Sequence, residues 1–186
     1  RYKRGLMQAL FSQSLRFTKP DGTAFPDWEE KTILELAWVN PKSPILPEVF
    51  KYIDLESVKN GILGDASTID VHDAPSRAQR FLNRGDILYQ TVRPYQRNNL
   101  FFDLAGDYVA STGYAQLRAK ENKSFLFQLI HTDFFVNSVL ERCTGTSYPA
   151  INSNDLAKIS VRVPHPDEQQ KIADALSAMD AKIAAV

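Results

Sequence analysis

The sequence has a single cysteine, no apolar run long enough to cross a membrane and no excess of either charge. Cys143 alone cannot form an internal disulfide, which suits a reducing compartment such as the cytoplasm. The 22 basic and 22 acidic residues cancel, which argues against the bulk positive field of a nonspecific nucleic-acid binder. With 186 residues, 44% of them hydrophobic, we predict one domain with no membrane contact. Since residue 1 is arginine, we expect a piece of a longer chain.

Familiar catalytic motifs are also missing. The sequence contains no phosphate-binding loop ending in Lys-Ser or Lys-Thr, no Gly-x-Ser-x-Gly, and no Asn-Pro-Pro-Tyr or Asp-Pro-Pro-Tyr of amino-methyltransferases. The three histidines are too far apart to show metal-ligand spacing. One catalytic alternative stays open, a magnesium-dependent nuclease that uses Asp107, Glu121 and Lys123. A structural adaptor without DNA contact is a further alternative.

Both ends of the chain have helical periodicity. Residues 2–12 place Leu6 and Leu10 on one face of a helix. After the prolines at 164 and 166, Asp167 is a candidate cap that Gln170 completes as a capping box. Apolar residues then follow at intervals of four, three and four, which is typical of a coiled-coil seam. These seam residues are Ile172, Leu176, Met179 and Ile183. We therefore expect this C-terminal helix to bind a partner. The opening helix is the obvious partner, and a second copy of the chain or a methyltransferase is the alternative.

Short strands dominate the region between these ends. We predict strands over residues 28–31, 49–54, 86–89, 99–102, 115–117 and 159–163. A short helix over residues 33–39 would be capped by Thr32, and residues 124–142 would form two helices with Thr132 or Asp133 capping the second. The predicted fold class is α+β: an irregular, curved β-sheet with a few packed helices, flanked by N- and C-terminal coiled-coil-type helices.

Positive charge is concentrated in one segment. Between Ala74 and Leu100 five arginines accompany a single carboxylate, Asp86. A guanidinium binds phosphate oxygens or the guanine edge in a bidentate way, and amides pair with adenine. The candidate DNA-contacting residues here are Arg77, Arg80, Arg84, Arg93, Tyr95, Gln96, Arg97, Asn98 and Asn99. The alternative is that some of these arginines pair with nearby carboxylates such as Asp73 and Asp86.

A second candidate contact is the small, polar segment from Thr144 to Asn154. It offers hydroxyls, backbone amides and one tyrosine with little side-chain bulk, so a DNA backbone or groove can approach closely. The candidate residues are Thr144, Thr146, Ser147 and Tyr148. The alternative is a purely structural turn.

The order of the sequence blocks resembles a known family, the DNA specificity (S) subunits of type I restriction-modification enzymes. The resemblance extends over nearly the whole chain. The blocks are Lys3–Phe11, Leu15–Phe17, Phe25–Trp28, Arg84–Leu88, Arg93-Pro94, Ala110–Tyr114, Gly145–Asn152, Val163-Pro164 and Glu168–Ala173, with Leu176, Asp180 and Ile183 after them. No single block is specific, so the identification depends on their order and distances.

This resemblance implies a role and a set of partners. Residues 1–17 would end a conserved spacer helix, residues 18–163 would form a target recognition domain, and residues 164–186 would start a second spacer helix. The domain would read one half of a bipartite site in double-stranded DNA without catalysing a reaction. Modification methyltransferase subunits and a restriction/translocase subunit would be its partners. S-adenosylmethionine, ATP and Mg²⁺ would belong to those subunits, and this chain would hold no cofactor.

Overall fold

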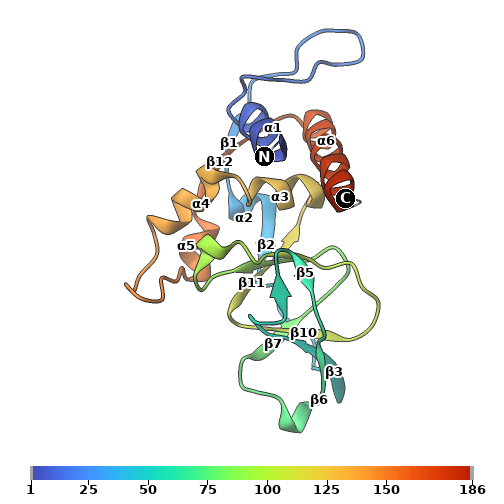
Figure 1. The fold of residues 1–186 in the computed structure, drawn as a ribbon, viewed down its shortest axis with the longest axis vertical. Coiled ribbons are helices and arrows are strands. Elements are labelled where there is room, and N and C mark those ends of the chain that lie inside the picture. The colour runs from blue at the N-terminus through green and yellow to red at the C-terminus, as the bar shows by residue number, and fades with distance from the viewer. Residues whose placement is uncertain (1, 185–186) are drawn as a thin grey trace.

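The two end helices lie side by side at one end of the molecule (Figure 1). The computed structural model describes residues 2–184, so residues 1, 185 and 186 of the predicted end segments lie outside the described part. Helix α1 (Tyr2–Phe11) packs against α6 (Pro166–Ala184). Lys3 forms an ion pair with Asp180, and Arg16, beyond the other end of α1, pairs with Glu168 in the first turn of α6. The two helices are therefore antiparallel.

The strands form several small sheets. One four-stranded antiparallel sheet contains, in spatial order, β2 (Ala37–Val39), β11 (Tyr114–Ala119), β8 (Ile87–Gln90) and β9 (Leu100–Phe101). The second contains β6 (Ser67–Asp70), β3 (Val49–Ile53), β10 (Tyr108–Ser111) and β7 (Ala78–Phe81), with β3 and β10 parallel. Two further pairs join β1 (Glu29–Thr32) to β12 (Ser160–Val163) and β4 (Val58–Lys59) to β5 (Ile62–Leu63). The predicted α+β class is confirmed.

The remaining helices are short, and polar side chains cap most of them. They are α2 (Ile33–Leu36), α3 (Lys123–Leu129), α4 (Asp133–Leu140), α5 (Ser153–Ala157) and the 3₁₀ turns η1 (Val71–Asp73) and η2 (Pro94–Gln96). Thr32 forms a capping box with Glu35, and Thr132 accepts a hydrogen bond from Phe135 N at the start of α4. The predicted Thr32 cap is confirmed, and of the two caps predicted for α4 the structure has Thr132 and not Asp133.

Two helices begin or end at other residues than the sequence predicted. The helix expected over residues 33–39 stops at Leu36, because Ala37 turns extended and residues 37–39 pair with β11. Sheet pairing here overrides the helical pattern. Helix α6 starts at Pro166, so Asp167 lies in its first turn instead of capping it. The end of the predicted polar segment also differs, since Asn152 caps α5 and residues 153 and 154 lie in this helix.

Every predicted strand overlaps an observed one, but several strands were missed. The missed strands are β2, β4, β5, β6, β7 and β10. All four residues of β10 are buried, so this strand lacks the alternation of apolar and polar residues that identifies a half-buried strand. Strands β4 and β5 have two residues each, too few to show a period.

The main hydrophobic core joins the end helices to the body. Ile172 and Leu176 of α6 are buried in the same cluster as Leu10 of α1 and the apolar face of α3. Over this part the predicted seam therefore packs against α1, the opening helix, and against α3. Toward the end of α6 the seam becomes exposed to solvent, since Ile183 is 58% exposed. Within residues 2–184, no helix has both the length and the apolar character needed to span a bilayer.

Candidate nucleic-acid interface

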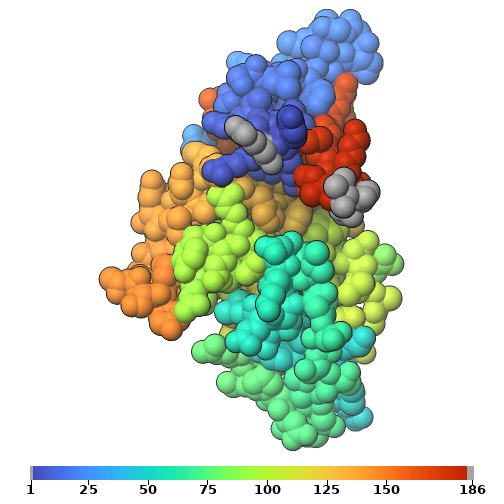
Figure 2. Space-filling view, viewed as in Figure 1, coloured from blue at the N-terminus to red at the C-terminus, as the bar shows by residue number. Residues whose placement is uncertain are grey.

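The two segments predicted to contact DNA lie next to each other, although they are far apart in the sequence. We call residues 93–99 the reading loop and residues 144–150 the hydroxyl loop. Val92 and Ala150 form a β-bridge, and Arg93 N donates a hydrogen bond to Pro149 O at 2.7 Å. Figure 2 shows the light-green reading loop and the orange hydroxyl loop on one face of the molecule. They therefore form a continuous surface.

Arg93 and Tyr148 mark the junction of the two loops. The Arg93 guanidinium carbon lies 4.2 Å from the centre of the Tyr148 ring, which is a cation–π contact. Tyr148 is 64% exposed, and Tyr95 of the reading loop is also exposed. Thr144 and Ala150 close the hydroxyl loop through two backbone hydrogen bonds, which leaves Thr146 and Ser147 exposed near its tip. The junction thus presents charge, aromatic surface and hydroxyls together.

The backbone of the reading loop is unusual. Arg93 and Arg97 flank the single turn η2, and both adopt the left-handed conformation, with φ of 53° and 56°. A left-handed non-glycine residue is disfavoured by about 1 kcal/mol. Arg97 is held there by its side chain, which donates to His131 O at 3.0 Å and to Asp133 Oδ1 at 2.6 Å. This arginine is therefore an internal anchor of the loop.

The side-chain amides of the reading loop make hydrogen bonds within the protein. Gln90 Nε2 donates to Gln96 Oε1 at 2.9 Å, while Gln90 Oε1 accepts from Asn98 N at 3.1 Å. The Asn98 side chain accepts from Asn60 N. Asn99 is 1% exposed, and its Oδ1 accepts from Gln90 N at 2.8 Å. The geometry thus gives Asn99 a role in shaping the loop instead of the adenine contact expected from the sequence.

A half-buried histidine, His131, contacts the side chain of Asn99. His131 Nδ1 lies 2.7 Å from Phe127 O, and Nε2 lies 3.3 Å from Asn99 Nδ2. This arrangement requires the proton on Nδ1, so that Nε2 can accept from the amide. Burial lowers the pKa of His131 to about 4, which keeps the ring neutral at pH 7. His131 is thus a fixed support for the reading loop.

The other arginines of the basic segment differ in their partners. Arg84 pairs with Asp103 at 3.0 Å, which was not the partner expected from the sequence. Within residues 2–184, no ion pair joins Arg77, Arg80 or Arg93 to a carboxylate. Arg80 Nε is buried without a hydrogen-bond partner among these residues, and burial lowers the pKa of Arg80. Among the described residues, three of the five arginines therefore have no carboxylate partner.

Asp86, directly before β8, has a structural role. It is 1% exposed and accepts from Arg118 Nε and Nη2 at 2.8 and 2.9 Å and from Gln116 Nε2 at 2.7 Å. Its carboxylate also accepts from Asn83 N in the turn before β8. These bonds tie β11 to the start of β8, and the reading loop follows shortly after the other end of β8. Arg118 carried no sequence signal because its partner lies 32 residues away.

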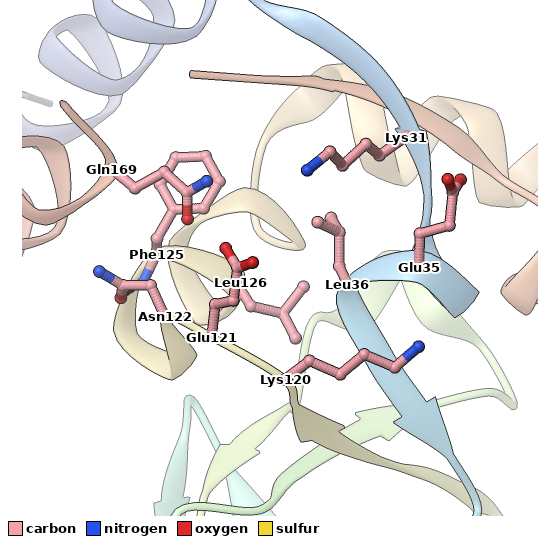
Figure 3. A pocket seen from close by; sticks show the side chains of 9 residues that line it. All are labelled: Lys31, Glu35, Leu36, Lys120, Glu121, Asn122, Phe125, Leu126 and Gln169. Carbon is pink, nitrogen blue, oxygen red and sulfur yellow. Dashed lines mark hydrogen bonds between the residues drawn. The ribbon is translucent and has the colours of Figure 1, made fainter. Parts of the chain in front are cut away.

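The residues of the nuclease alternative do not converge. Asp107 precedes β10 in one four-stranded sheet, whereas Glu121 follows β11 in the other. Figure 3 shows Glu121 lining a cavity of about 30 Å³ whose wall includes neither Asp107 nor Lys123. That volume holds about one water molecule. Within the described residues, no group of three or more His, Cys, Asp and Glu is placed to hold a metal ion.

Comparison with known protein families matches residues 26–185 to the family described as "Type I restriction modification DNA specificity domain". Among curated proteins, the HindI specificity subunit of Haemophilus influenzae is 31% identical over 71% of this chain and 30% of its own length. The MjaVIII specificity subunit of Methanocaldococcus jannaschii is 24% identical over 96% of this chain and 46% of its own length. The chain therefore spans less than half of these relatives.

Solved structures show the same fold. The HsdS subunit from Thermoanaerobacter tengcongensis superposes with a TM-score of 0.71 at 27% identity, covering 90% of this chain and 46% of that one. A chain from a study of complex assembly and conformational transition of the type I R-M system gives 0.73 at 27% identity, covering 84% and 43%. Since a family model covers most of the sequence and the fold agrees, the chain belongs to the type I restriction-modification DNA specificity family.

Proposed function

We propose that this chain recognises one half of a bipartite site in double-stranded DNA through the reading loop and the hydroxyl loop. One observation carries this proposal: the fold brings the two loops together at Arg93 and Tyr148. The resulting surface combines a guanidinium without a carboxylate partner among the described residues, exposed aromatic rings and exposed hydroxyls. These are the groups that position a protein on phosphates and read base edges.

The candidate residues would have different roles. The residues at the joined surface would contact DNA. They are Arg93, Tyr95, Gln96, Thr144, Thr146, Ser147 and Tyr148. Arg77 and Arg80 would add phosphate contacts from the β7 region. Asn98, Asn99 and Arg97 would instead hold the shape of the loop, and Arg84 would be shared between Asp103 and solvent.

The relatives' names as specificity subunits support the proposal of a wider assembly. The domain itself would be non-catalytic and act in the cytoplasm. It would position modification methyltransferase subunits and a restriction/translocase subunit, which would carry S-adenosylmethionine, ATP and Mg²⁺. The antiparallel pair α1 and α6 would continue into the helical spacer, with Leu6, Met179 and Ile183 at its less buried edge.

The test is DNA binding by the full-length subunit to duplexes selected from a random pool, measured as a function of salt concentration. Replacing Arg93 by alanine is expected to weaken binding by about tenfold, the effect of losing one bidentate contact. If Arg93 binds phosphate, the salt slope also decreases by about one. The matched control is Arg142→Ala, since Arg142 is exposed and its guanidinium donates to Ser138 O of the preceding helix α4. Unchanged binding and salt slope in Arg93→Ala would contradict the proposed interface.

A further inference from the structure

One carboxylate connects the reading loop to helix α1. Asp133 is the first residue of α4, and its two oxygens bind guanidinium groups from different segments. We infer that Asp133 is a positioning residue that fixes the reading loop relative to α1, so that base selection depends on where α1 lies. This inference rests on the proposed DNA-contacting role of the reading loop.

The hydrogen bonds of Asp133 divide between its oxygens. Oδ1 accepts from Arg97 Nη2 at 2.6 Å, and Oδ2 accepts from Arg4 Nη2 at 2.8 Å and Nε at 3.1 Å. The hydrogen bonds from Arg97 and Arg4 lower the pKa of Asp133, so the carboxylate is charged at neutral pH. Each guanidinium therefore has a charge-assisted bond to the same group.

The side-chain bonds of Arg97 matter because they hold its own backbone, at the end of η2, in a disfavoured conformation. Arg97 closes η2 in the left-handed conformation, which an arginine side chain disfavours. Its second bond, from Nη1 to His131 O, fixes the guanidinium to the turn between α3 and α4. Loss of the carboxylate would leave this strained residue with one anchor instead of two. Tyr95 and Gln96, which lie within η2, would then lose their fixed orientation.

The ion pair between Arg4 and Asp133 lies beside a hollow next to α1. A cavity of about 400 Å³ lies between α1 and the turn that joins α3 to α4. Its apolar lining includes Met7, Phe11, Leu129 and Phe134, and Arg4 and Asp133 also contribute to its wall. The bonds from Arg4 and Arg97 to Asp133 connect α1 to the anchor of the reading loop through side chains. A displacement of α1 would therefore reach Arg97 through this carboxylate.

The test compares base selection by variants of the full-length subunit in a random-duplex pool. In Arg4→Ala and Asp133→Asn, selected sequences are expected to become degenerate at the positions that the reading loop contacts. Affinity for the parent's selected duplex should decrease by about threefold in Arg4→Ala, the scale of an exposed ion pair. The salt slope should stay unchanged, since neither residue touches phosphate. Arg97→Lys should broaden selection too, because lysine keeps the charge but cannot form both bonds.

The matched control is Lys3→Ala. Lys3 is the neighbour of Arg4 on α1, but it pairs with Asp180 of α6 and makes no link to the reading loop. The Lys3→Ala variant should select the same DNA sequence as the unsubstituted protein. Equal broadening in Lys3→Ala, a reduced salt slope in Arg4→Ala, or unchanged selection in Arg4→Ala would each overturn the inference. Arg4→Ala decides the matter even if Asp133→Asn fails to fold, because Arg4 is exposed.

Failure of this inference can be separated from failure of the proposed function. If Arg93→Ala leaves DNA binding unchanged, the interface itself is wrong. If Arg93→Ala weakens binding while Arg4→Ala keeps the parent's selection, only the positioning role of Asp133 is wrong.

Discussion

The guanidinium of Arg93 stacks on the ring of Tyr148, 4.2 Å from its centre, and joins two loops that enter the fold from different elements. Arg93 follows β8, whereas Tyr148 lies between α4 and α5. An exposed cation–π contact contributes about 0.5–1 kcal/mol, enough to favour one orientation of the arginine. The ring therefore orients the charge that we place against DNA.

Two substitutions of Tyr148 distinguish the role of its ring from the role of its hydroxyl. Tyr148→Phe keeps the platform under Arg93, so DNA affinity should stay within about twofold of the parent. Tyr148→Ala removes the platform and is expected to weaken binding by about fivefold. Competition binding with a selected duplex measures both. An equal loss in the two variants would show that the hydroxyl contacts DNA and that the ring does not orient Arg93.

Asp86 is expected to be a major contributor to stability. Asp86→Ala leaves Arg118 without its carboxylate and removes acceptors for Gln116 and Asn83 N, so the free energy of unfolding should decrease by about 3 kcal/mol. Urea unfolding measures this change. Asp103→Ala is the control, because the Arg84–Asp103 pair is exposed and should contribute less than about 1 kcal/mol. A similar small loss in both variants would contradict the role of Asp86.

His131 predicts a pH dependence of stability. Its pKa is lowered from 6.5 to about 4 in the folded protein. Between these values the unfolded chain binds a proton that the folded chain does not, so stability should decrease as the pH falls through this window. The slope from this group is at most about 1.4 kcal/mol per pH unit. His131→Asn keeps a donor for Phe127 O but cannot titrate, so it should flatten the slope between pH 6.5 and 4. The same slope in both proteins would show that other groups cause it.

The Arg16–Glu168 pair is expected to hold the entry to the domain against α6. Glu168 is fully buried and accepts from Arg16 Nε and Nη2 at 3.1 and 2.7 Å. Arg16→Ala leaves a buried carboxylate unpaired, which should decrease the free energy of unfolding by about 3 kcal/mol. Lys31→Ala is the control, because Lys31 makes only a 3.8 Å pair with the exposed Glu29. Urea unfolding that ranks the two variants equally would contradict this assignment.

The sequence predicted features that depend on neighbouring residues. Helical spacing located α1 and α6, and the threonines at 32 and 132 identified helix starts because a cap binds an amide a few residues away. The cluster of arginines also identified the segment that carries the reading loop. The order of blocks along the chain pointed to the family, which the comparison over residues 26–185 supports.

The sequence could not predict features that depend on distant residues. Asn99 looked like a reading residue, but the fold buries it against Gln90 and His131. Arg97 looked like a DNA contact, yet Asp133, 36 residues away, binds its guanidinium. Ile172 and Leu176 looked like an open seam because α3, which covers them, lies elsewhere in the sequence. In each case a tertiary contact decides between a surface role and an internal one.

Hydrogen exchange of the full-length subunit, with and without a duplex selected from a random pool, tests the central claim most directly. The interface proposed here predicts slower exchange of backbone amides in the reading loop and the hydroxyl loop when DNA is bound, with α6 unchanged. Slower exchange confined to α1 and α6, with both loops unaffected by a duplex that binds, would contradict it.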